Sequence, residues 1–315
     1  MPNDPVHDAA ATIDARSRAG SPRATFRRAL VVANPIAGRG RARAVARETA
    51  EGLARMGIAC DLHMTQARDD ARVKLRCLAP DIDLVVAIGG DGTVNEVLDG
   101  LVNRDVPVAI VPLGTGNVLG LDLGLPRDVD RALEMIAAGR TTPLDVARVN
   151  ARHLCFLVTG VGADAMIAQR LERRRNGPIT KLDWGRAALR ALAEYAPPAL
   201  EVEIEGRRVD GDFGLVLVSN IVHYAGVRVL SADRRIDDGL FEAYLFRKSS
   251  KASLVGYALR GLLRGLPGGS CARHAVKHVR VSSPAPVPYQ VDGDWRGVTP
   301  VEIAVAPSQF RLVVP

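Results

Sequence analysis

Three glycine-rich stretches in the first half of the chain have the composition of phosphate-binding loops. They span residues 34–40, 89–92 and 114–116, and each follows a short apolar run. Glycine lets the backbone approach an anion closely, and a helix that starts after such a loop offers unpaired N–H groups to it. Three arginines lie in or beside the first loop: Arg39, Arg41 and Arg43. Because all three loops share this character, we expect them to bind a nucleotide or another phosphate-bearing ligand.

The segments around these loops predict a Rossmann-like α/β domain. Apolar runs at 30–33, 58–64, 84–88 and 106–111 are expected to form strands, and helical stretches alternate with them, the last at 129–138. Strands that alternate with helices form a parallel sheet covered on both faces, and the carboxyl ends of its strands line one crevice. The glycine loops are therefore expected at one edge of the sheet.

The second half of the chain is strand-rich instead. Short apolar runs after about residue 143 predict strands at 144–148, 153–158, 200–204, 213–218, 241–246, 276–281 and 301–305. Two helical insertions are expected, one at 165–175 with 181–195 and the other at 253–266. This pattern predicts a mostly antiparallel β-sandwich. We expect a disordered N-terminal tail at 1–26, an α/β domain at 27–143 and a β-rich domain with helical insertions at 144–315.

The second glycine loop carries a carboxylate, which is unusual beside a phosphate site. Asp91 lies in the stretch Gly89-Gly90-Asp91-Gly92-Thr93-Val94-Asn95-Glu96. Either Asp91 only forms the turn, with Thr93 as the N-cap of the next helix, or it orients the loop or bridges to phosphate through Mg²⁺. Neither GxxxxGK[ST] nor GxGxxG follows the first strand, so a P-loop NTPase and a dinucleotide-binding Rossmann domain are not expected.

The composition narrows the choice of partner and compartment. Lys and Arg number 42 against 35 Asp and Glu, and a net charge of +7 favours an anionic partner. No helix-turn-helix, zinc-finger or RNP-like pattern occurs, so no nucleic-acid partner is expected. No apolar run approaches the roughly 18–20 residues of a membrane-spanning helix, and the first residues lack the apolar region of a secretory signal. The four cysteines form no CxxC pair, as expected for reduced thiols in a cytoplasmic protein.

Six motifs between about Ala29 and the C-terminus occur in an order that resembles a known family. They are Asn34-Pro35…Gly38…Gly40, Gly89 to Glu96, Pro112-Leu113-Gly114-Thr115-Gly116-Asn117, Gly160-Val161-Gly162-Ala163-Asp164-Ala165, Asp237-Asp238-Gly239-Leu240 and Gln290-Val291-Asp292-Gly293-Asp294. Together they resemble the diacylglycerol kinase catalytic domain family, which includes bacterial lipid kinases and the sphingosine and ceramide kinases. The Gly-Gly-Asp-Gly-Thr element alone is shared with NAD kinases and, in related form, with phosphofructokinases.

The resemblance implies an ATP- and Mg²⁺-dependent kinase that transfers the γ-phosphoryl group to a lipid hydroxyl. Diacylglycerol, giving phosphatidic acid, is the first choice of substrate, with ATP bound by residues 27–143 and the lipid by 144–315. The residues expected to contact the nucleotide are Asn34 and Gly38 of the first loop, with Thr65, Gly89, Gly90, Asp91, Gly92, Thr93, Val94, Asn95 and Thr115.

The resemblance also implies a metal site and a catalytic base. Asp238 matches an Asp that binds Mg²⁺ in bacterial members, with Arg235 and Leu240 as carbonyl donors. The family's general base is the Glu of a Val-Asp-Gly-Glu motif, and the matching residue here is Asp294, one methylene shorter. Asp292 is the alternative base, and Asp91 is assigned a catalytic role in organising the phosphates.

Two segments of the second half have the character of a membrane-binding surface. Seven basic residues against two acidic ones lie between Arg170 and Arg190, with Trp184 among them. They are Arg170, Arg173, Arg174, Arg175, Lys181, Arg186 and Arg190. The second segment, 251–266, pairs an apolar face with basic residues: the apolar residues are Leu254, Tyr257, Ala258 and Leu262, and the basic ones are Lys251, Arg260 and Arg264. Peripheral contact with an anionic membrane at its inner face is one interpretation, and a core-packing helix with solvated charges is the other.

Other functions stay open on the sequence alone. An NAD kinase-like enzyme would phosphorylate a soluble dinucleotide, although the Asp-Asp-Gly-Leu and Val-Asp-Gly-Asp motifs argue against it. A non-catalytic lipid- or nucleotide-binding protein is the second alternative, because Asp replaces Glu at position 294. The identity of the lipid and the oligomeric state, a homodimer included, are left open.

Overall fold

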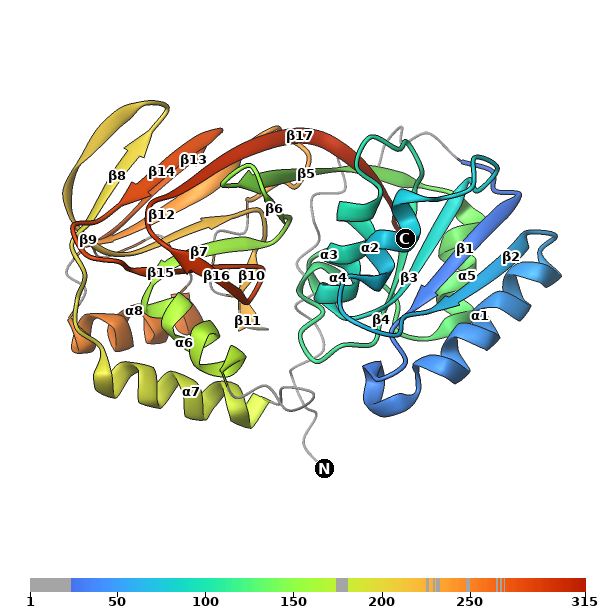
Figure 1. Cartoon of the computed structure of the whole chain (residues 1–315), viewed down its shortest axis with the longest axis horizontal. Coiled ribbons are helices and arrows are strands. Elements are labelled where there is room, and N and C mark those ends of the chain that lie inside the picture. The colour runs from blue at the N-terminus through green and yellow to red at the C-terminus, as the bar shows by residue number, and fades with distance from the viewer. Residues whose placement is uncertain are drawn as a thin grey trace.

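The computed structural model of the chain describes residues 24–173, 181–224, 227–228, 230, 233–247, 250–264, 266, 268 and 270–315. They form an α/β half and a β-rich half, joined by two long strands, β5 (Thr141–Val149) and β17 (Val301–Val313) (Figure 1). Within these residues, no helix has the length and apolar character needed to cross a membrane.

The first half is built on a parallel sheet in the order β2–β1–β3–β4. Its strands are β1 (Arg28–Ala33), β2 (Ala59–Met64), β3 (Leu84–Gly89) and β4 (Val108–Pro112). Every residue of β3 and β4 is buried, as expected for central strands made of continuous Val, Ile, Leu and Ala. The predicted Rossmann-like sheet is confirmed.

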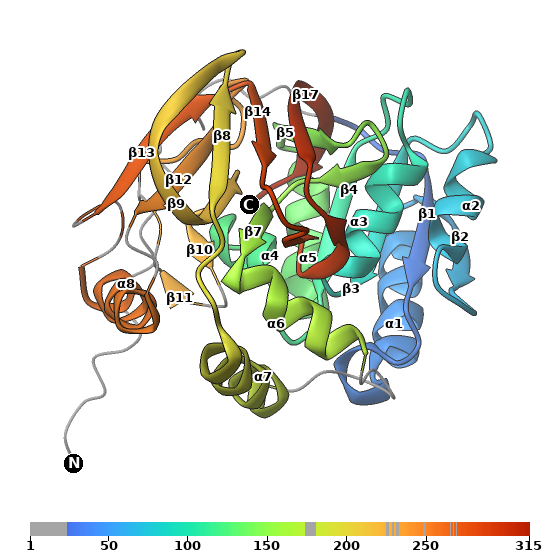
Figure 2. The same cartoon turned by 60° about the vertical axis from the view of Figure 1, so that its left-hand side comes forward.

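Helices cover both faces of this sheet. They are α1 (Ala42–Arg55), α2 (Asp70–Arg76), α3 (Asp91–Gly100), α4 (Val118–Asp122) and α5 (Val129–Ala138), and a 3₁₀ turn, η2 (Ala37–Gly40), precedes α1. The crossover from β1 to β2 runs in the opposite direction along the sheet from the crossovers from β2 to β3 and from β3 to β4. Right-handed connections therefore place α1 on one face and α2 and α3 on the other (Figure 2). The loops after β1, β3 and β4 consequently meet at one edge.

The second half is antiparallel, and the predicted β-sandwich character is confirmed. Its strands are β6 (His153–Cys155), β7 (Val158–Gly162), β8 (Leu200–Ile204), β9 (Arg207–Ser219), β10 (His223–Tyr224), β11 (Val227–Arg228), β12 (Phe241–Arg247), β13 (Cys271–Val276), β14 (His278–Ser282), β15 (Pro288–Val291) and β16 (Asp294–Val298). Its helices are α6 (Ala163–Glu172), α7 (Lys181–Glu194) and α8 (Lys251–Arg264). A second apolar core is built from inward-facing residues of these strands.

Two of the expected strands are each divided in two by a distant carboxylate. The 153–158 run breaks between β6 and β7, where the N–H groups of Phe156 and Leu157 donate to Asp292. The 276–281 run breaks between β13 and β14, where the N–H groups of Lys277 and His278 donate to Oε1 of Glu205 at 2.6 and 2.9 Å. A side chain thus takes the donors that a continuous ladder would have used.

The final strand links the two halves into one sheet. β17 pairs with β14 and β5 in antiparallel register, and Leu312 near its end pairs in parallel with Val108 of β4. The last residues of the chain therefore pack in the first half, although the sequence analysis assigned 144–315 to the second domain. This long shared strand holds the two halves facing each other.

Candidate active site

A cleft of about 1530 Å³ lies between the two halves, at the carboxyl edge of the parallel sheet. One wall is formed by the loops after β1 to β4, and the other by the β15–β16 turn. Eight of the expected nucleotide contacts line it: Asn34, Gly38, Thr65, Gly90, Gly92, Thr93, Asn95 and Thr115. Gly89, Asp91 and Val94 do not line it, and the Val94 side chain is buried in the core.

The second and third glycine loops touch each other backbone to backbone. A Cβ on Gly114 would lie 2.5 Å from the Cα of Gly90, a separation that real side chains do not reach. Asn117, in the left-handed region at φ 50°, fixes the third loop by accepting from the Gly114 N–H at 2.8 Å and donating to its carbonyl at 2.6 Å. Glycine is needed at position 114 to bring these loops together, and at position 90 a Cβ would lie 3.2 Å from the Cα of Gly114, a tight contact.

Asp91 holds the third loop from behind the cleft. Its Oδ2 accepts from the N–H of Val118 at 3.2 Å, at the start of α4. Burial raises the pKa of Asp91, while N–H groups around Val118 oppose this effect. The N-cap of α3 is Gly90, and Thr93 packs against Gly89 inside the first turn, so Thr93 is not the N-cap. Asp91 therefore orients the two loops relative to each other.

The first loop has a strained backbone that projects arginines into the cleft. Gly38 and Arg39 lie in the left-handed region at φ 61° and 59°, within η2. Arg39 and Arg41 line the cleft, whereas Arg43 does not. The tight path of the chain here depends on Asn34, whose Oδ1 accepts from the Ile36 N–H at 3.2 Å.

Asp292 joins the two halves at the base of the cleft. Its carboxylate accepts from the N–H groups of Phe156, Leu157 and Val158 at 3.0–3.2 Å. It also accepts from Nδ2 of Asn95 at 2.9 Å and from the Cys155 thiol at 3.4 Å. Burial raises the pKa of Asp292 to about 6, against the opposing effect of the N–H donors. A carboxylate with five donors is a positioning group, which argues against Asp292 as the base.

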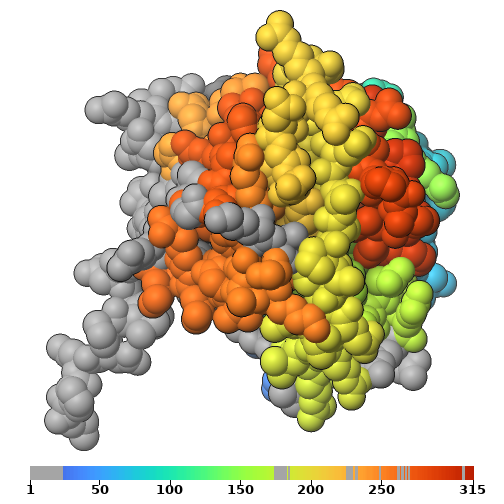
Figure 3. All heavy atoms as spheres, turned by 90° about the vertical axis from the view of Figure 1, so that its left-hand side faces the viewer, coloured from blue at the N-terminus to red at the C-terminus, as the bar shows by residue number. Residues whose placement is uncertain are grey.

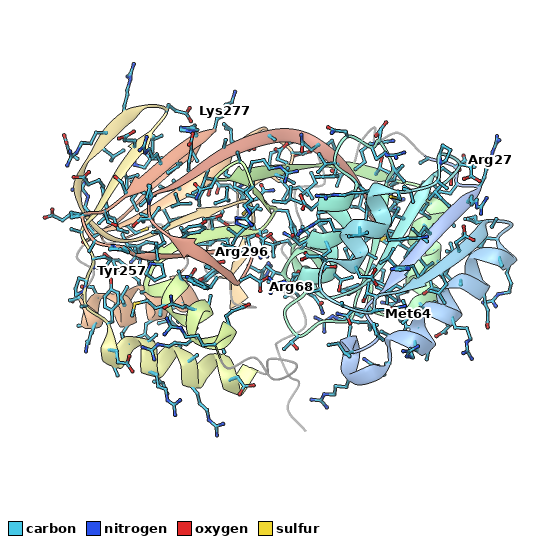
Figure 4. All side chains as sticks on the ribbon, viewed as in Figure 1. Arg27, Met64, Arg68, Tyr257, Lys277 and Arg296 are labelled. Carbon is cyan, nitrogen blue, oxygen red and sulfur yellow. The ribbon has the colours of Figure 1, made fainter. Side chains whose placement is uncertain are left out.

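Asp294 is paired with one arginine from each half. Its Oδ2 lies 3.0 Å from Nη2 of Arg68, in the loop after β2, and 3.0 Å from Nη2 of Arg296 on β16. Arg68 also pairs with Glu172 at the end of α6, at 3.3 Å. Figure 4 shows Arg68 and Arg296 close together at the junction of the halves. The Asp294 side chain is 32% exposed and lines the cleft, so it is accessible to a ligand.

Arginines line the cleft, and three of them, Arg68, Arg72 and Arg296, were not expected from the sequence. Five line it: Arg39, Arg41, Arg68, Arg72 and Arg296. Guanidinium groups bind phosphate through paired hydrogen bonds, so this lining suits a polyanionic ligand. Arg68 and Arg296 carry no motif and gain their role by pairing with Asp294, which for Arg68 lies 226 positions away.

A buried chain of hydrogen bonds supports the β15–β16 turn. Nε2 of Gln290 donates to Asp164 at 2.7 Å, and its Oε1 accepts from the N–H of Gly293 at 2.7 Å. Burial raises the pKa of Asp164 to about 6, with the Gln290 bond opposing it. Asp164 and Gln290 both lie in motifs that carry the family resemblance, at 160–165 and 290–294, but no sequence pattern predicts that they pair. They fix the turn that carries Asp294.

The metal site expected at Arg235, Asp238 and Leu240 does not fit the structure. These residues lie outside the cleft lining, and the guanidinium of Arg234 takes both oxygens of the Asp238 carboxylate and the Leu240 carbonyl. The Arg235 side chain pairs with Asp237 at 3.2 Å. Among the described residues, no three His, Cys, Asp or Glu side chains gather as a metal site. The guanidinium group of Arg234 already occupies the position expected for the ion.

Asp164→Asn is expected to raise the free energy of unfolding at neutral pH. The pKa of Asp164 is about 6 in the folded chain and about 4 in an unfolded one, so the folded state holds a proton that the unfolded state has released. The stability contributed by this group is complete below about pH 4 and is lost as the pH rises through 6. Asparagine keeps an acceptor for Gln290 but carries no charge, so the variant should avoid this loss of stability, which amounts to about 3 kcal/mol.

Urea unfolding between about pH 4 and about pH 7.5 measures this effect. Asp292→Asn is the comparison, because the five donors at that site require a group that only accepts. An amide would turn N–H groups toward those donors, so Asp292→Asn should lose stability above about pH 6, where Asp292 is ionised. If the free energy of unfolding of Asp164→Asn falls with pH as it does in the unaltered protein, burial of Asp164 is not the cause of that fall.

Two domain families match the chain in order. The diacylglycerol kinase catalytic domain matches residues 28–149, and the YegS C-terminal NAD kinase beta sandwich-like domain matches residues 158–314. The diacylglycerol kinase of Staphylococcus carnosus (strain TM300) is 25% identical over 294 residues, which cover 92% of this chain and 95% of the relative. The diacylglycerol kinase of Bacillus subtilis (strain 168) is 25% identical over 296 residues, covering 92% and 97%.

Solved structures share the fold. A diacylglycerol kinase from Bacillus anthracis str. Sterne superposes with a TM-score of 0.73 at 19% identity, over 93% of this chain and 98% of that one. Another chain from that organism reaches 0.79 at 21% identity, over 93% and 99%. With both domain families matched in order over most of its length, the chain belongs to the diacylglycerol kinase catalytic domain family and is a kinase of that type, a phosphotransferase with an alcohol acceptor.

Proposed function

We propose that the protein is an ATP- and Mg²⁺-dependent lipid kinase that converts diacylglycerol to phosphatidic acid. One observation carries the proposal: the glycine loops and arginines of one wall face Asp294, on the other wall, across a single cleft. Phosphoryl transfer needs a polyanion held in place and an acceptor hydroxyl held in line with it, with a group to accept the proton. The names of the curated relatives support diacylglycerol as the acceptor.

The nucleotide would bind at the edge where the three glycine loops meet. Backbone N–H groups of the loops and the guanidinium groups of Arg39 and Arg41 would contact its phosphates. Asp91 acts from behind by keeping the second and third loops in register, so we assign it a positioning role in place of the catalytic one. Mg²⁺ enters as the counter-ion of ATP and neutralises phosphate charge, as part of the substrate.

Asp294 is the proposed general base. Arg68 and Arg296 hold Oδ2 of Asp294 from both walls of the cleft. A γ-phosphoryl group would compete for these guanidinium groups and draw them toward the phosphate. Asp294 would then accept the proton of the lipid hydroxyl as that oxygen attacks phosphorus, while ADP leaves on the opposite side.

A transfer assay with γ-labelled ATP tests the substrate class. Diacylglycerol, sphingosine, ceramide and NAD⁺ are offered separately, each with Mg²⁺ and with a chelator, and the products are identified by mass. Label is expected in phosphatidic acid, and only with Mg²⁺ present. Label in NAD⁺ alone would establish the NAD kinase-like alternative, and no label with any acceptor would favour a non-catalytic binding protein.

Replacing Asp294 tests the base. Asp294→Ala should lower kcat by about 10² to 10⁴, with KM for ATP changed far less, because the base acts on the acceptor hydroxyl. Asp294→Glu should retain much of the activity, since it keeps the carboxylate. Asp210→Ala, which removes an exposed carboxylate on β9, is the matched control and should behave like the unaltered protein. A kcat for Asp294→Ala near that of the control would reject the role.

We also propose that α7 and α8 contact an anionic membrane. Three apolar residues of α8 at spacings of four are exposed on one face: Val255 at 42%, Leu259 at 55% and Leu263 at 80%. Leu189 of α7 is 71% exposed. Figure 3 shows the two helices together at the lower rim of one face of the molecule. They are joined by a hydrogen bond, in which Lys251 of α8 donates to the Ala193 carbonyl near the end of α7.

The charge around this apolar face suits an acidic lipid surface. Arg173, Arg186 and Arg190 are exposed, whereas Arg170 pairs with Glu194. Arg174 and Arg175 lie outside the described residues, as do the side chains of Lys181 and Trp184. The surface adjoins the cleft, because α6 ends at Glu172, which contacts Arg68. Leu254 and Tyr257, which belong to the expected apolar face of α8, pack against the core. The exposed apolar face is formed by Val255, Leu259 and Leu263 instead.

Vesicle flotation tests this surface. The double variant Leu259→Glu/Leu263→Glu should lower binding to phosphatidylglycerol-containing vesicles by about tenfold or more, because two exposed leucines that would enter the lipid are replaced by charges that anionic lipid repels. Val73→Glu, at a 61% exposed residue of α2, is the control and should bind as before. Equal binding to neutral and anionic vesicles would remove the electrostatic part, and full binding by the double variant would reject the surface.

A further inference from the structure

A buried arginine lies at the centre of the turn that precedes β12. Arg234 has a side chain that is only 2% exposed. Its Nη1 donates to both carboxylate oxygens of Asp238 at 2.9 Å each. Its Nη2 donates to the Leu240 carbonyl and to Oδ1 of Asn220. Four oxygens from two segments of the chain therefore converge on one guanidinium group.

These oxygens are held in place by further hydrogen bonds. Nδ2 of Asn220 donates to the Asp145 carbonyl at 2.8 Å, which fixes Oδ1 toward Arg234. The N–H of Gly239 donates to the Asp145 carboxylate at 2.6 Å, and the N–H of Leu240 donates to Asp238 at 3.1 Å. The turn is thereby attached to β5 and to the end of β9, and its oxygens face inward as a preformed set.

The same set of oxygens is the kind that hard divalent cations bind. A carboxylate, a backbone carbonyl and an amide oxygen are common ligands of Mg²⁺ and Ca²⁺. The guanidinium already donates a hydrogen bond to each of these oxygens, so an ion at the same position would have to displace a buried and fully ionised side chain. Displacing Arg234 would leave its charge without a partner in the interior, which costs several kcal/mol.

We propose that the guanidinium of Arg234 replaces the divalent ion that the family resemblance implies at this turn, so that Asp238 and Leu240 bind no metal in this protein. The positive charge is covalently attached and permanent, because arginine does not lose its proton. The fold of the turn then does not depend on the supply of a cation. Any Mg²⁺ requirement of the enzyme belongs to the nucleotide alone.

The turn is also connected to the active-site cleft. Asn220, which Arg234 holds, donates its backbone N–H to the Leu157 carbonyl at 2.8 Å. Leu157 in turn donates its own N–H to Asp292 at 3.0 Å. Arg234 therefore supports the segment that Asp292 organises, and acts as a positioning residue at a distance from the cleft.

The test measures ion binding and stability in the absence of nucleotide and lipid, so its outcome is independent of the proposed substrate. Mn²⁺ binding is followed by electron paramagnetic resonance, and Tm is measured with a chelator and with millimolar Mg²⁺. The unaltered protein should bind no stoichiometric Mn²⁺, and its Tm should be the same in both conditions. Stoichiometric Mn²⁺ binding that Asp238→Asn abolishes would overturn the proposal without any arginine variant.

Removing the guanidinium should convert the turn into a site for an ion. Arg234→Ala should lower Tm by about 5 °C in the chelator, and Mg²⁺ or Mn²⁺ should restore a large part of the loss. Arg234→Ala combined with Asp238→Asn should lose that ion dependence. Arg235→Ala removes the neighbouring arginine, 57% exposed, and should change neither Tm nor Mn²⁺ binding. If Arg234→Ala folds but gains no response to either ion, the claim that these oxygens form a cation site is wrong.

Discussion

The placement of the Asp292 carboxylate is the constraint on which the active-site cleft depends. A carboxylate at this depth must be satisfied by donors, and it takes them from the β6–β7 turn and from Asn95 on α3. Those bonds interrupt a strand that the sequence would otherwise continue, and they attach the β15–β16 turn to the first half. Asp294, two residues later, consequently faces the glycine loops.

The junction between the halves follows the same principle elsewhere. Asp122 at the end of α4 accepts from the N–H groups of Val222 and His223, at the start of β10, at 2.8 and 3.1 Å. Asp99 of α3, 11% exposed, is paired with Arg148 of β5 and Arg72 of α2. Directional bonds of this kind fix relative position more sharply than apolar packing does. Within the cleft, they also keep Arg68 and Arg296 beside Asp294.

Much of the fold was predictable because its signals are local. The parallel strands are continuous runs of Val, Ile and Leu between glycine turns, and their predicted limits differ from the observed ones by two residues or fewer. The three loops were placed at one edge by topology alone. The strand breaks at 156–157 and at 277 were missed because distant carboxylates cause them, Asp292 in the first case and Glu205 in the second. Arg68 was missed for the same reason, since its pairing with Asp294 across 226 residues leaves no pattern in either segment. Arg296 lies only two residues after Asp294, but it belongs to no motif.

The chain departs from the family pattern at two positions, and both departures concern the pairing of a carboxylate with arginine. At position 294, the proposed base, a carboxylate one methylene shorter than the family's Glu is held by arginines from both walls of the cleft. At the turn before β12, an arginine stands among oxygens that suit a metal ion. Nearly all of the 42 basic residues are arginines, whose planar donors can satisfy two or more oxygens at once. Arginines thus line the cleft with positive charge and, outside it, Arg234 pairs from a buried position with the partly exposed carboxylate of Asp238. The excess of positive charge in the composition reflects both roles.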